Sequence, residues 1–354
     1  MYYVGVDLHK EQSWFYVMDN KGTKVLSKSI TNKPEVLKSF FSAIPTPFTV
    51  AVEATYNWYF FVDIAEQYAK QVFLANSYEL KAFAKRHKKT DMIDARLIAD
   101  VLRKGFLPTV FIPNKATRAL RELLHCRINL VRDRCRYIFR LKNILDKLGA
   151  DSSGDFTTIK GVRNVPTDSF LPVHQRIITE YVNQITLLSQ RIHNTKSYLK
   201  EYLSNDIDIK HLIDIEGIDY FSAALIKTEI GDINRFNSFN RLCSFAGLAP
   251  RVSQSGNKST IHGPLMVNRR KNLQWILLET VFHFIKGSPN RVARWEELKI
   301  RKGSNTAKVI MARQMLNIIY HVLKERRPYY SDGNKKYGHV NQVQSVATAA
   351  LTGV

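Results

Sequence analysis

The chain has 354 residues, 45% of them hydrophobic, and its 53 Lys and Arg residues against 31 Asp and Glu leave a formal charge of +22. So large an excess of positive charge predicts a nucleic-acid partner. No apolar run approaches the ~20 residues of a membrane-spanning helix, and the first residues lead into an apolar strand instead of a signal peptide. We therefore expect a cytoplasmic protein that makes no membrane contact and has roughly two or three domains.

The N-terminal third of the chain has the pattern of an α/β domain. Three apolar, β-branched stretches predict a strand meander at residues 2–7, 13–18 and 24–29. Strands and helices then alternate, with helices at 34–43, 58–69 and 91–104 and strands at 48–53 and 71–75. A meander followed by this alternation is the layout of the ribonuclease H-like fold.

Four carboxylates stand at chemically informative places in that domain. Asp7 and Glu53 each end an apolar strand, and Asp91 and Asp94 are three residues apart on one helix face. Such like charges repel unless a cation lies between them, and oxygen clusters suit Mg²⁺ or Mn²⁺. A single acid is more often a solvated carboxylate or a helix cap, as Asp91 after Thr90 could be. The four together favour a metal site, where two ions could clamp a phosphodiester.

A long stretch without Gly or Pro, residues 116–148, predicts one amphipathic helix. A second helix at 173–203 could fold back on it around the polar linker 149–171. The first helix is rich in basic residues, which could form a merely solvated face. Since few acids accompany them, we favour a role in binding phosphate backbones or a second subunit. The basic residues are Arg118, Arg121, Arg127, Arg132, Arg134, Arg136, Arg140 and Lys142.

The C-terminal region predicts a mainly α domain. Residues 213–224 have the pattern of a helix-hairpin-helix, whose backbone N–H groups could bind a phosphate, although a structural helix-turn-helix would look the same. Residues 245–263 form a Gly-, Ser- and Lys-rich loop, and such loops hold function more often than packing. The Ser255-Gly256 pair could equally be a simple turn. Helices at 271–286 and 306–323 should pack together, and a polar tail follows.

Six segments, in chain order, resemble the signatures of the IS110-type insertion-sequence transposases, the DEDD/serine recombinases related to the pilin-gene invertase. No single segment suffices, but six in order are specific. They are Gly5-Val-Asp7-Leu-His-Lys10, Val52-Glu53-Ala-Thr55, Lys89-Thr-Asp91-Met-Ile-Asp94-Ala, Ile230-Gly-Asp-Ile-Asn-Arg-Phe236, Ala246-Gly-Leu-Ala-Pro250 and Ser255-Gly256.

The resemblance implies four domains: a RuvC-like DEDD catalytic domain at 1–112, a helical coiled-coil spacer at 113–205, a transposase domain at 206–330 and a polar tail at 331–354. It also implies the site residues. Asp7, Glu53, Asp91 and Asp94 would hold Mg²⁺ or Mn²⁺, and Ser255 would be the nucleophile. Basic residues expected at the nucleic acid are Lys88, Lys89, Arg132, Arg136, Arg140, Arg251 and Lys258.

The activity that the resemblance implies is cutting and rejoining of DNA strands. The serine would attack a phosphodiester and form a 5′-phosphoserine link, which conserves the bond energy so that joining needs no ATP. A structured bridge RNA would pair with donor and target DNA, and exchange of two duplexes would require a homo-oligomer, a dimer or a tetramer.

The chain departs from the family pattern in two places. Gly217-Ile-Asp219 replaces the commoner Gly-Ile-Gly, and the segment 264–274 ends in Gln274 where the family usually has a Leu-Arg pair. Ser253 also stands two residues before Ser255 as an alternative nucleophile. Two other functions stay open: a RuvC-like nuclease that hydrolyses branched DNA with water, and a non-catalytic nucleic-acid-binding protein.

Overall fold

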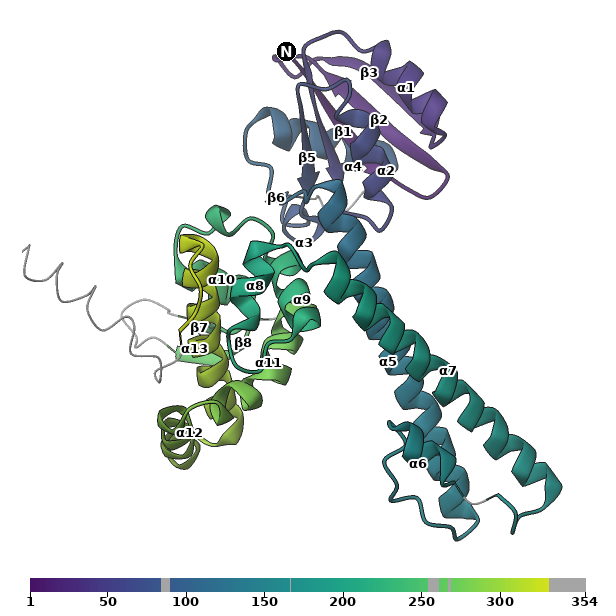
Figure 1. Cartoon of the computed structure of the whole chain (residues 1–354). Helices are drawn as coiled ribbons and strands as arrows, with labels where there is room; N and C mark the ends of the chain where they lie inside the picture. Colours follow the sequence, from purple (N-terminus) through teal and green to yellow (C-terminus); the bar gives the residue numbers. More distant parts are fainter. Residues whose placement is uncertain (84–89, 166, 254–260, 267–268, 331–354) are drawn as a thin grey trace, which may run out of the picture. The chain divides into compact units, whose positions relative to one another are not determined.

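The structure is a computed structural model of the chain and describes residues 1–83, 90–165, 167–253, 261–266 and 269–330 (Figure 1). The chain forms two compact units, Met1–Pro113 and Asn114–Val354. The first is a mixed α/β sheet unit and the second is mostly helical, as the sequence predicted. The division into four domains stays a prediction, and its polar tail lies outside the described residues.

The first unit is built on a six-stranded sheet in the order β3-β2-β1-β4-β5-β6. The first three strands pair antiparallel as a meander, β4 and β5 continue parallel to β1, and β6 closes the edge antiparallel to β5. The meander and the later strands β4 and β5 were expected, whereas the short β6 was not. The strands are β1 (Tyr2–Leu8), β2 (Gln12–Met18), β3 (Lys24–Thr31), β4 (Phe48–Glu53), β5 (Gln71–Ala75) and β6 (Thr109–Val110).

Side-chain alternation along β1 divides the helices between the two faces of the sheet. Val4 and Val6 point into an aromatic-rich core with helices α1 (Pro34–Ser42) and α2 (Trp58–Ala65). The opposite face of the sheet packs against Ala95 and Ala99 of α4 (Asp91–Arg103). Asp7 belongs to this second face, since it is in phase with Gly5. A short helix, α3 (Ser77–Leu80), follows β5.

Gly5 is the place where helix α4 lies directly on strand β1. A Cβ at this position would come within 2.1 Å of the Ala95 carbonyl oxygen and 2.4 Å of the Ala99 nitrogen. Only glycine permits so close an approach of helix backbone to strand. Since α4 begins with Asp91 and Asp94, this contact sets how far those acids lie from the end of β1.

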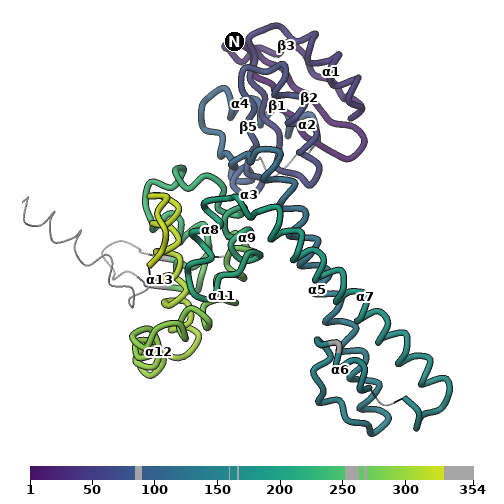
Figure 2. Tube along the Cα trace, viewed as in Figure 1, coloured from purple at the N-terminus to yellow at the C-terminus, as the bar shows by residue number. Residues whose placement is uncertain are grey.

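The second unit starts with the predicted helical hairpin, α5 (Lys115–Lys147) and α7 (Pro172–Tyr202), which lie side by side in Figure 2. Ile138 and Leu141 near the end of α5 share a core with Ile178 and Ile185 near the start of α7, so the helices are antiparallel. The linker between them is more ordered than its polar composition predicted. It contains the short helix α6 (Ile159–Arg163), and Phe156 is buried against the hairpin.

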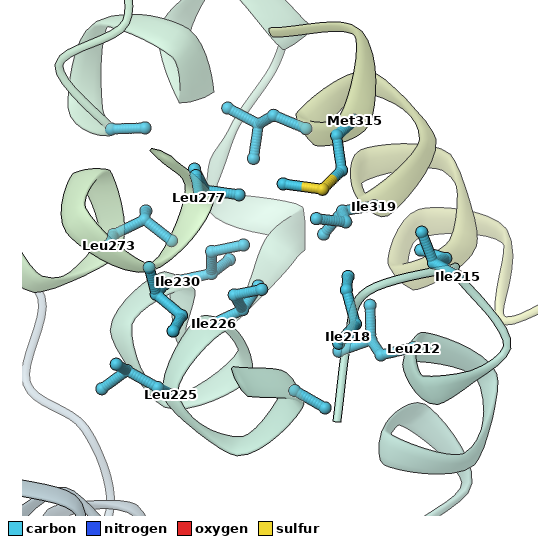
Figure 3. Packing of buried hydrophobic residues seen from close by; sticks show 14 of the residues in the cluster. Leu212, Ile215, Ile218, Leu225, Ile226, Ile230, Leu273, Leu277, Met315 and Ile319 are labelled. Atoms are coloured by element: carbon cyan, nitrogen blue, oxygen red, sulfur yellow. The ribbon is translucent and has the colours of Figure 1, made fainter. Parts of the chain in front are cut away.

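Helix α9 (Tyr220–Ile230) packs against α5, α7, α8 (Ile207–Ile213) and α11 (Lys271–Lys286), and every residue of α9 from Phe221 is buried except Lys227. Figure 3 shows its residues Ile226 and Ile230 in the same core as Leu277 and Met315. The other elements are the 3₁₀ turn η1 (Ile233–Arg235), α10 (Phe239–Phe245), β7 (Pro250–Ser253), β8 (Ile261–Leu265), α12 (Pro289–Lys302) and α13 (Ser304–Glu325).

The turn between α8 and α9 centres on Gly217, which has a φ of +88°. A Cβ there would lie 2.7 Å from the His283 Cβ and 2.9 Å from the Phe284 nitrogen, so the turn packs against the backbone of α11. The helix–turn–helix is thus present, with one side of its turn covered by protein. In the described part of the chain, no helix has the length and apolar character needed to cross a bilayer.

Candidate metal centre

Two of the predicted acids meet because their strands are neighbours. Strands β1 and β4 run parallel with Val6 opposite Val52. Asp7 and Glu53 are the next residues along these strands, so both lie at the same end of the neighbouring strands. Asp7 is only 7% exposed, whereas Glu53 is half-buried. The apolar strand β1 thus holds the carboxylate of Asp7 where water has little access.

Helix α4 brings the other two acids over β1. Thr90 is the helix N-cap, and its hydroxyl accepts a hydrogen bond from the Ile93 N–H at 3.3 Å. Capping is therefore not the role of Asp91, which is the first residue of the helix and has a side chain 59% exposed. Asp94 lies in the same first turn. The positive end of the helix dipole favours carboxylates there.

The pKa of the Asp7 carboxyl responds to all of these acids. This pKa is raised from 3.8 to about 6: burial is the largest cause, nearby His9 lowers it, and the charges of Asp91, Asp94 and Glu53 each raise it. One buried group thus senses three acids from two other elements. Such mutual repulsion is relieved by protonation or by a bound cation.

The structure adds a residue that the sequence interpretation missed. The Nε2 atom of His9 lies 3.2 Å from an Asp7 oxygen and 3.5 Å from an Asp91 oxygen. Donor atoms of these three residues all lie within 4.8 Å of one another. The signal was present in the chain, because His9 follows Asp7 by two residues and is in phase with it along the strand direction.

These donors fit a divalent cation. Two ligands at about 2.1 Å from one octahedral ion are about 3 Å apart on adjacent vertices and about 4.2 Å apart on opposite ones. The His9–Asp7 and His9–Asp91 distances are close to the first value. Carboxylate oxygens are also the ligands that Mg²⁺ and Mn²⁺ prefer.

Several of the predicted site residues lie outside the described residues. These are Lys88 and Lys89 in the segment 84–89, and Ser255 and Lys258 in the segment 254–260. Arg251 is described, and it is exposed on β7. The choice between Ser255 and Ser253 as nucleophile therefore stays open.

The strands that flank the segment 254–260 pair as an antiparallel ribbon, with Ser253 opposite Ile261. A hydrogen-bond chain braces the base of this ribbon. Gln274 donates from Nε2 to the Gly247 carbonyl at 2.7 Å and accepts from Arg269 Nε at 2.6 Å. The departure from the family pattern at Gln274 therefore has a structural use.

A buried ion cluster lies at the start of α11. Glu229 of α9 is 3% exposed, and Arg270 donates to it from Nη2 at 2.9 Å and from Nε at 3.0 Å. Burial alone would raise the pKa of Glu229, but a hydrogen bond from His125, the charges of Arg270 and Arg121, and a hydrogen bond from Asn272 hold it at about 2. The cluster ties α5, α9 and the start of α11 together.

The basic residues of α5 divide into two groups. Toward the C-terminal half, Arg132, Arg136 and Arg140 are exposed, and the last two line a hollow of about 390 Å³ between α5 and α7. Nearer the N-terminus of α5 the prediction of a solvated or ligand-binding basic face is wrong, because Arg118 and Arg121 are buried. Arg121 is used internally, since it donates to the Thr228 carbonyl oxygen of α9.

Comparison with known proteins relates both units to transposases. A family model described as "Transposase" matches residues 4–149, and one described as "Transposase IS116/IS110/IS902 family" matches residues 209–296. The transposase of insertion sequence element IS1328 from Yersinia enterocolitica is 26% identical over 326 residues, 90% of this chain and 96% of the relative.

Two further relatives are similar over shorter stretches. The transposase of element IS1111A from Coxiella burnetii is 23% identical over 272 residues, 72% of each chain. A pilin gene-inverting protein from Moraxella bovis is 29% identical over 120 residues, 33% of this chain and 37% of that protein.

Proposed function

The chain belongs to the IS116/IS110/IS902 family of insertion-sequence transposases, which confirms the resemblance seen in its motifs, and from this premise we propose how it rearranges DNA. The proposal is a recombinase that cuts and rejoins strands with a metal-binding acidic site and a serine nucleophile. The observation that carries it is Asp7, a buried carboxyl whose pKa is raised by burial and by three neighbouring acids. Keeping such a group ionised costs stability, and a catalytic cation explains why the chain tolerates the cost.

In this proposal Asp7, Glu53, Asp91 and Asp94 hold Mg²⁺ or Mn²⁺. When bound, the ion supplies Lewis-acid stabilisation of the phosphodiester oxygens. Asp7 must be ionised to act as a ligand, and Asp91 and Asp94 would supply further carboxylate ligands from the first turn of α4. The strand order and the acids at the ends of β1 and β4 support a RuvC-like, ribonuclease H-like fold for this unit.

Ser255 is proposed as the nucleophile on the strength of its motif. Its hydroxyl oxygen would bond to phosphorus while the 3′ oxygen of the cut strand leaves and takes up a proton. A 3′ hydroxyl of another strand would then displace the serine and restore a phosphodiester. One phosphoester bond breaks for each that forms, so the exchange needs no ATP.

Positive charge supports the proposed nucleic-acid partners, donor and target DNA and a bridge RNA. Arg132, Arg136 and Arg140 offer an exposed basic surface on α5, and Arg251 adds a charge on β7 beside the serine segment. Lys88, Lys89 and Lys258 would contribute further contacts. The α8–turn–α9 hairpin is proposed as a helix-hairpin-helix that contacts backbone phosphate, and the active assembly as a dimer or tetramer.

Capture of the covalent intermediate tests the proposal. Purified protein is incubated with Mg²⁺, element-end DNA and the transcript of the non-coding DNA beside the gene, and products are separated on a denaturing gel. Wild type should give a protein–DNA adduct and recombinant strands. Asp7→Ala should lose both products yet still bind nucleic acid, because phosphate contacts come from Lys and Arg.

Two serine variants decide the nucleophile and the rival functions. Ser255→Ala should yield no adduct, while the matched control Ser253→Ala should retain it. If Ser255→Ala still cuts DNA without an adduct, the protein is a nuclease that uses water. If neither wild type nor variants cut any DNA that they bind, the chain is a non-catalytic binding protein. An adduct in Ser255→Ala that is lost in Ser253→Ala would assign the nucleophile to Ser253.

A further inference from the structure

We propose that His9 is itself a ligand of the cation at the acidic site, and that its imidazole makes this site prefer Mn²⁺ over Mg²⁺. The inference rests on the proposed metal-dependent function and adds to it the choice of metal.

The position of the imidazole is the first argument. Its Nε2 atom lies between carboxylates from two elements, 3.2 Å from Asp7 on β1 and 3.5 Å from Asp91 on α4. The His9 side chain is 53% exposed, so the ion and its remaining waters have access from the solvent side. His9, the residue that follows β1, would thus add a nitrogen ligand to the carboxylate ligands of the proposed site.

The second argument is that the backbone of His9 is held firmly, unlike that of an ordinary surface residue. Its carbonyl oxygen accepts two side-chain amide hydrogen bonds, from Asn57 Nδ2 at 2.7 Å and from Asn32 Nδ2 at 2.8 Å. Each amide is in turn oriented by a hydroxyl: Thr55 donates to the Asn57 oxygen at 2.9 Å and Ser13 to the Asn32 oxygen at 2.7 Å.

This clamp joins three strand ends of the sheet. Asn57 follows β4, which carries Glu53, and Asn32 follows β3. The arrangement fixes the residue after β1 relative to the strand that presents another proposed ligand. Outer partners of this kind orient metal-binding residues, and their loss commonly costs about 10–100-fold in metal affinity.

The chemistry of the donor sets the metal preference. Mg²⁺ favours a shell made entirely of oxygen and gives up its waters reluctantly. Imidazole nitrogen is a better ligand for transition metals, and Mn²⁺ accepts both nitrogen and carboxylate oxygen. An acidic cluster with one imidazole should therefore hold Mn²⁺ more tightly than an all-carboxylate cluster would, with little gain for Mg²⁺.

Direct observation of the nitrogen–metal bond tests the proposal. The full-length protein labelled with ¹⁵N-histidine is mixed with MnCl₂ alone, and electron spin-echo spectra are recorded for wild type, His9→Ala and the exposed-histidine control His193→Ala. Wild type and His193→Ala should show coupling of one imidazole nitrogen to Mn²⁺, and His9→Ala should lose it. Asn57→Ala, which removes part of the clamp, should weaken the coupling.

Titration with MnCl₂ and with MgCl₂ supplies the second readout. The ratio of Mn²⁺ to Mg²⁺ affinity should fall at least about tenfold in His9→Ala and stay unchanged in His193→Ala. Circular dichroism checks that each variant is folded. Mn²⁺ bound by wild type without nitrogen coupling, or an unchanged affinity ratio in His9→Ala, would overturn the proposal and leave His9 as an ion-pair partner of the acids. If wild type binds neither ion, while Asp7→Asn behaves identically, the proposed function itself fails.

Discussion

Replacing Asp7 by Asn should stabilise the metal-free protein, even though it should abolish strand cleavage. The carboxyl is 7% exposed, and its pKa is raised from 3.8 to about 6, chiefly by burial and then, against the opposing effect of His9, by three acids. Above pH 6 the folded protein therefore carries an ionised group that the unfolded chain accommodates better. Asn has nearly the same shape and no charge.

The magnitude follows from proton linkage. A pKa difference of about two, at about 1.4 kcal/mol for each pKa unit, makes ionised Asp7 unfavourable to folding by about 3 kcal/mol at most. The sign is opposite to that of an ordinary ion-paired acid. Because the folded-state pKa is the higher one, the penalty is complete above pH 6 and disappears as the pH falls toward 3.8.

Urea denaturation in EDTA at pH 8 and pH 4 provides the measurement, with the exposed-acid variant Glu66→Gln as the control. The free energy of unfolding of Asp7→Asn should exceed that of wild type by about 1–3 kcal/mol at pH 8 and by less than about 1 kcal/mol at pH 4. Saturating Mg²⁺ should stabilise wild type and narrow the difference, since a ligand that binds only the folded state raises its stability.

The reasoning would be refuted if Asp7→Asn were no more stable than wild type at pH 8 without metal, or if its advantage were the same at both pH values. Either result would mean that the acids around Asp7 are too well solvated to repel one another, and the case for a cation among them would lose its physical basis.

Other regions of the chain give three further expectations. Gly5→Ala should lower the free energy of unfolding by about 2–3 kcal/mol, measured by urea denaturation, because its Cβ would collide with the backbone of α4. Glu229→Ala should lower the free energy of unfolding by about 3 kcal/mol, because it removes one partner of a buried ion pair. Acidification below the Glu229 pKa of about 2 should lower the stability of the wild type by the same amount. Neutralising Arg132, Arg136 and Arg140 should flatten the salt dependence of nucleic-acid binding by about one unit of slope for each lost contact; an unchanged slope would show that these residues are only solvated.

The sheet and the helical hairpin could be predicted because their signals are local. Alternating apolar residues reveal a strand wherever one face is buried, and the uninterrupted helical period of residues 116–148 allows little else. The same alternation assigned Asp7 and Glu53 to strand ends, which the structure places side by side.

The parts that sequence reasoning missed depend on partners far along the chain. Arg121 is an ordinary basic residue on a helix until the Thr228 carbonyl, 107 residues away, becomes its acceptor. Gly5 is one glycine in a strand until α4 lies on it. His9 had a local signal, its spacing from Asp7, but only the clamp from Asn32 and Asn57 shows that its position is fixed.

The proposed chemistry divides its parts between the two units. In the first unit the acids are held close by backbone contact at Gly5, so they are ready for a cation but cannot separate to relieve their repulsion. In the second, Gln274 of α11 donates to the Gly247 carbonyl beside the β7–β8 ribbon, and the proposed nucleophile Ser255 belongs to the same unit. The proposed mechanism therefore requires acids of the first unit and the serine of the second, from one or more copies of the chain, to reach the same phosphodiester before a strand is cut.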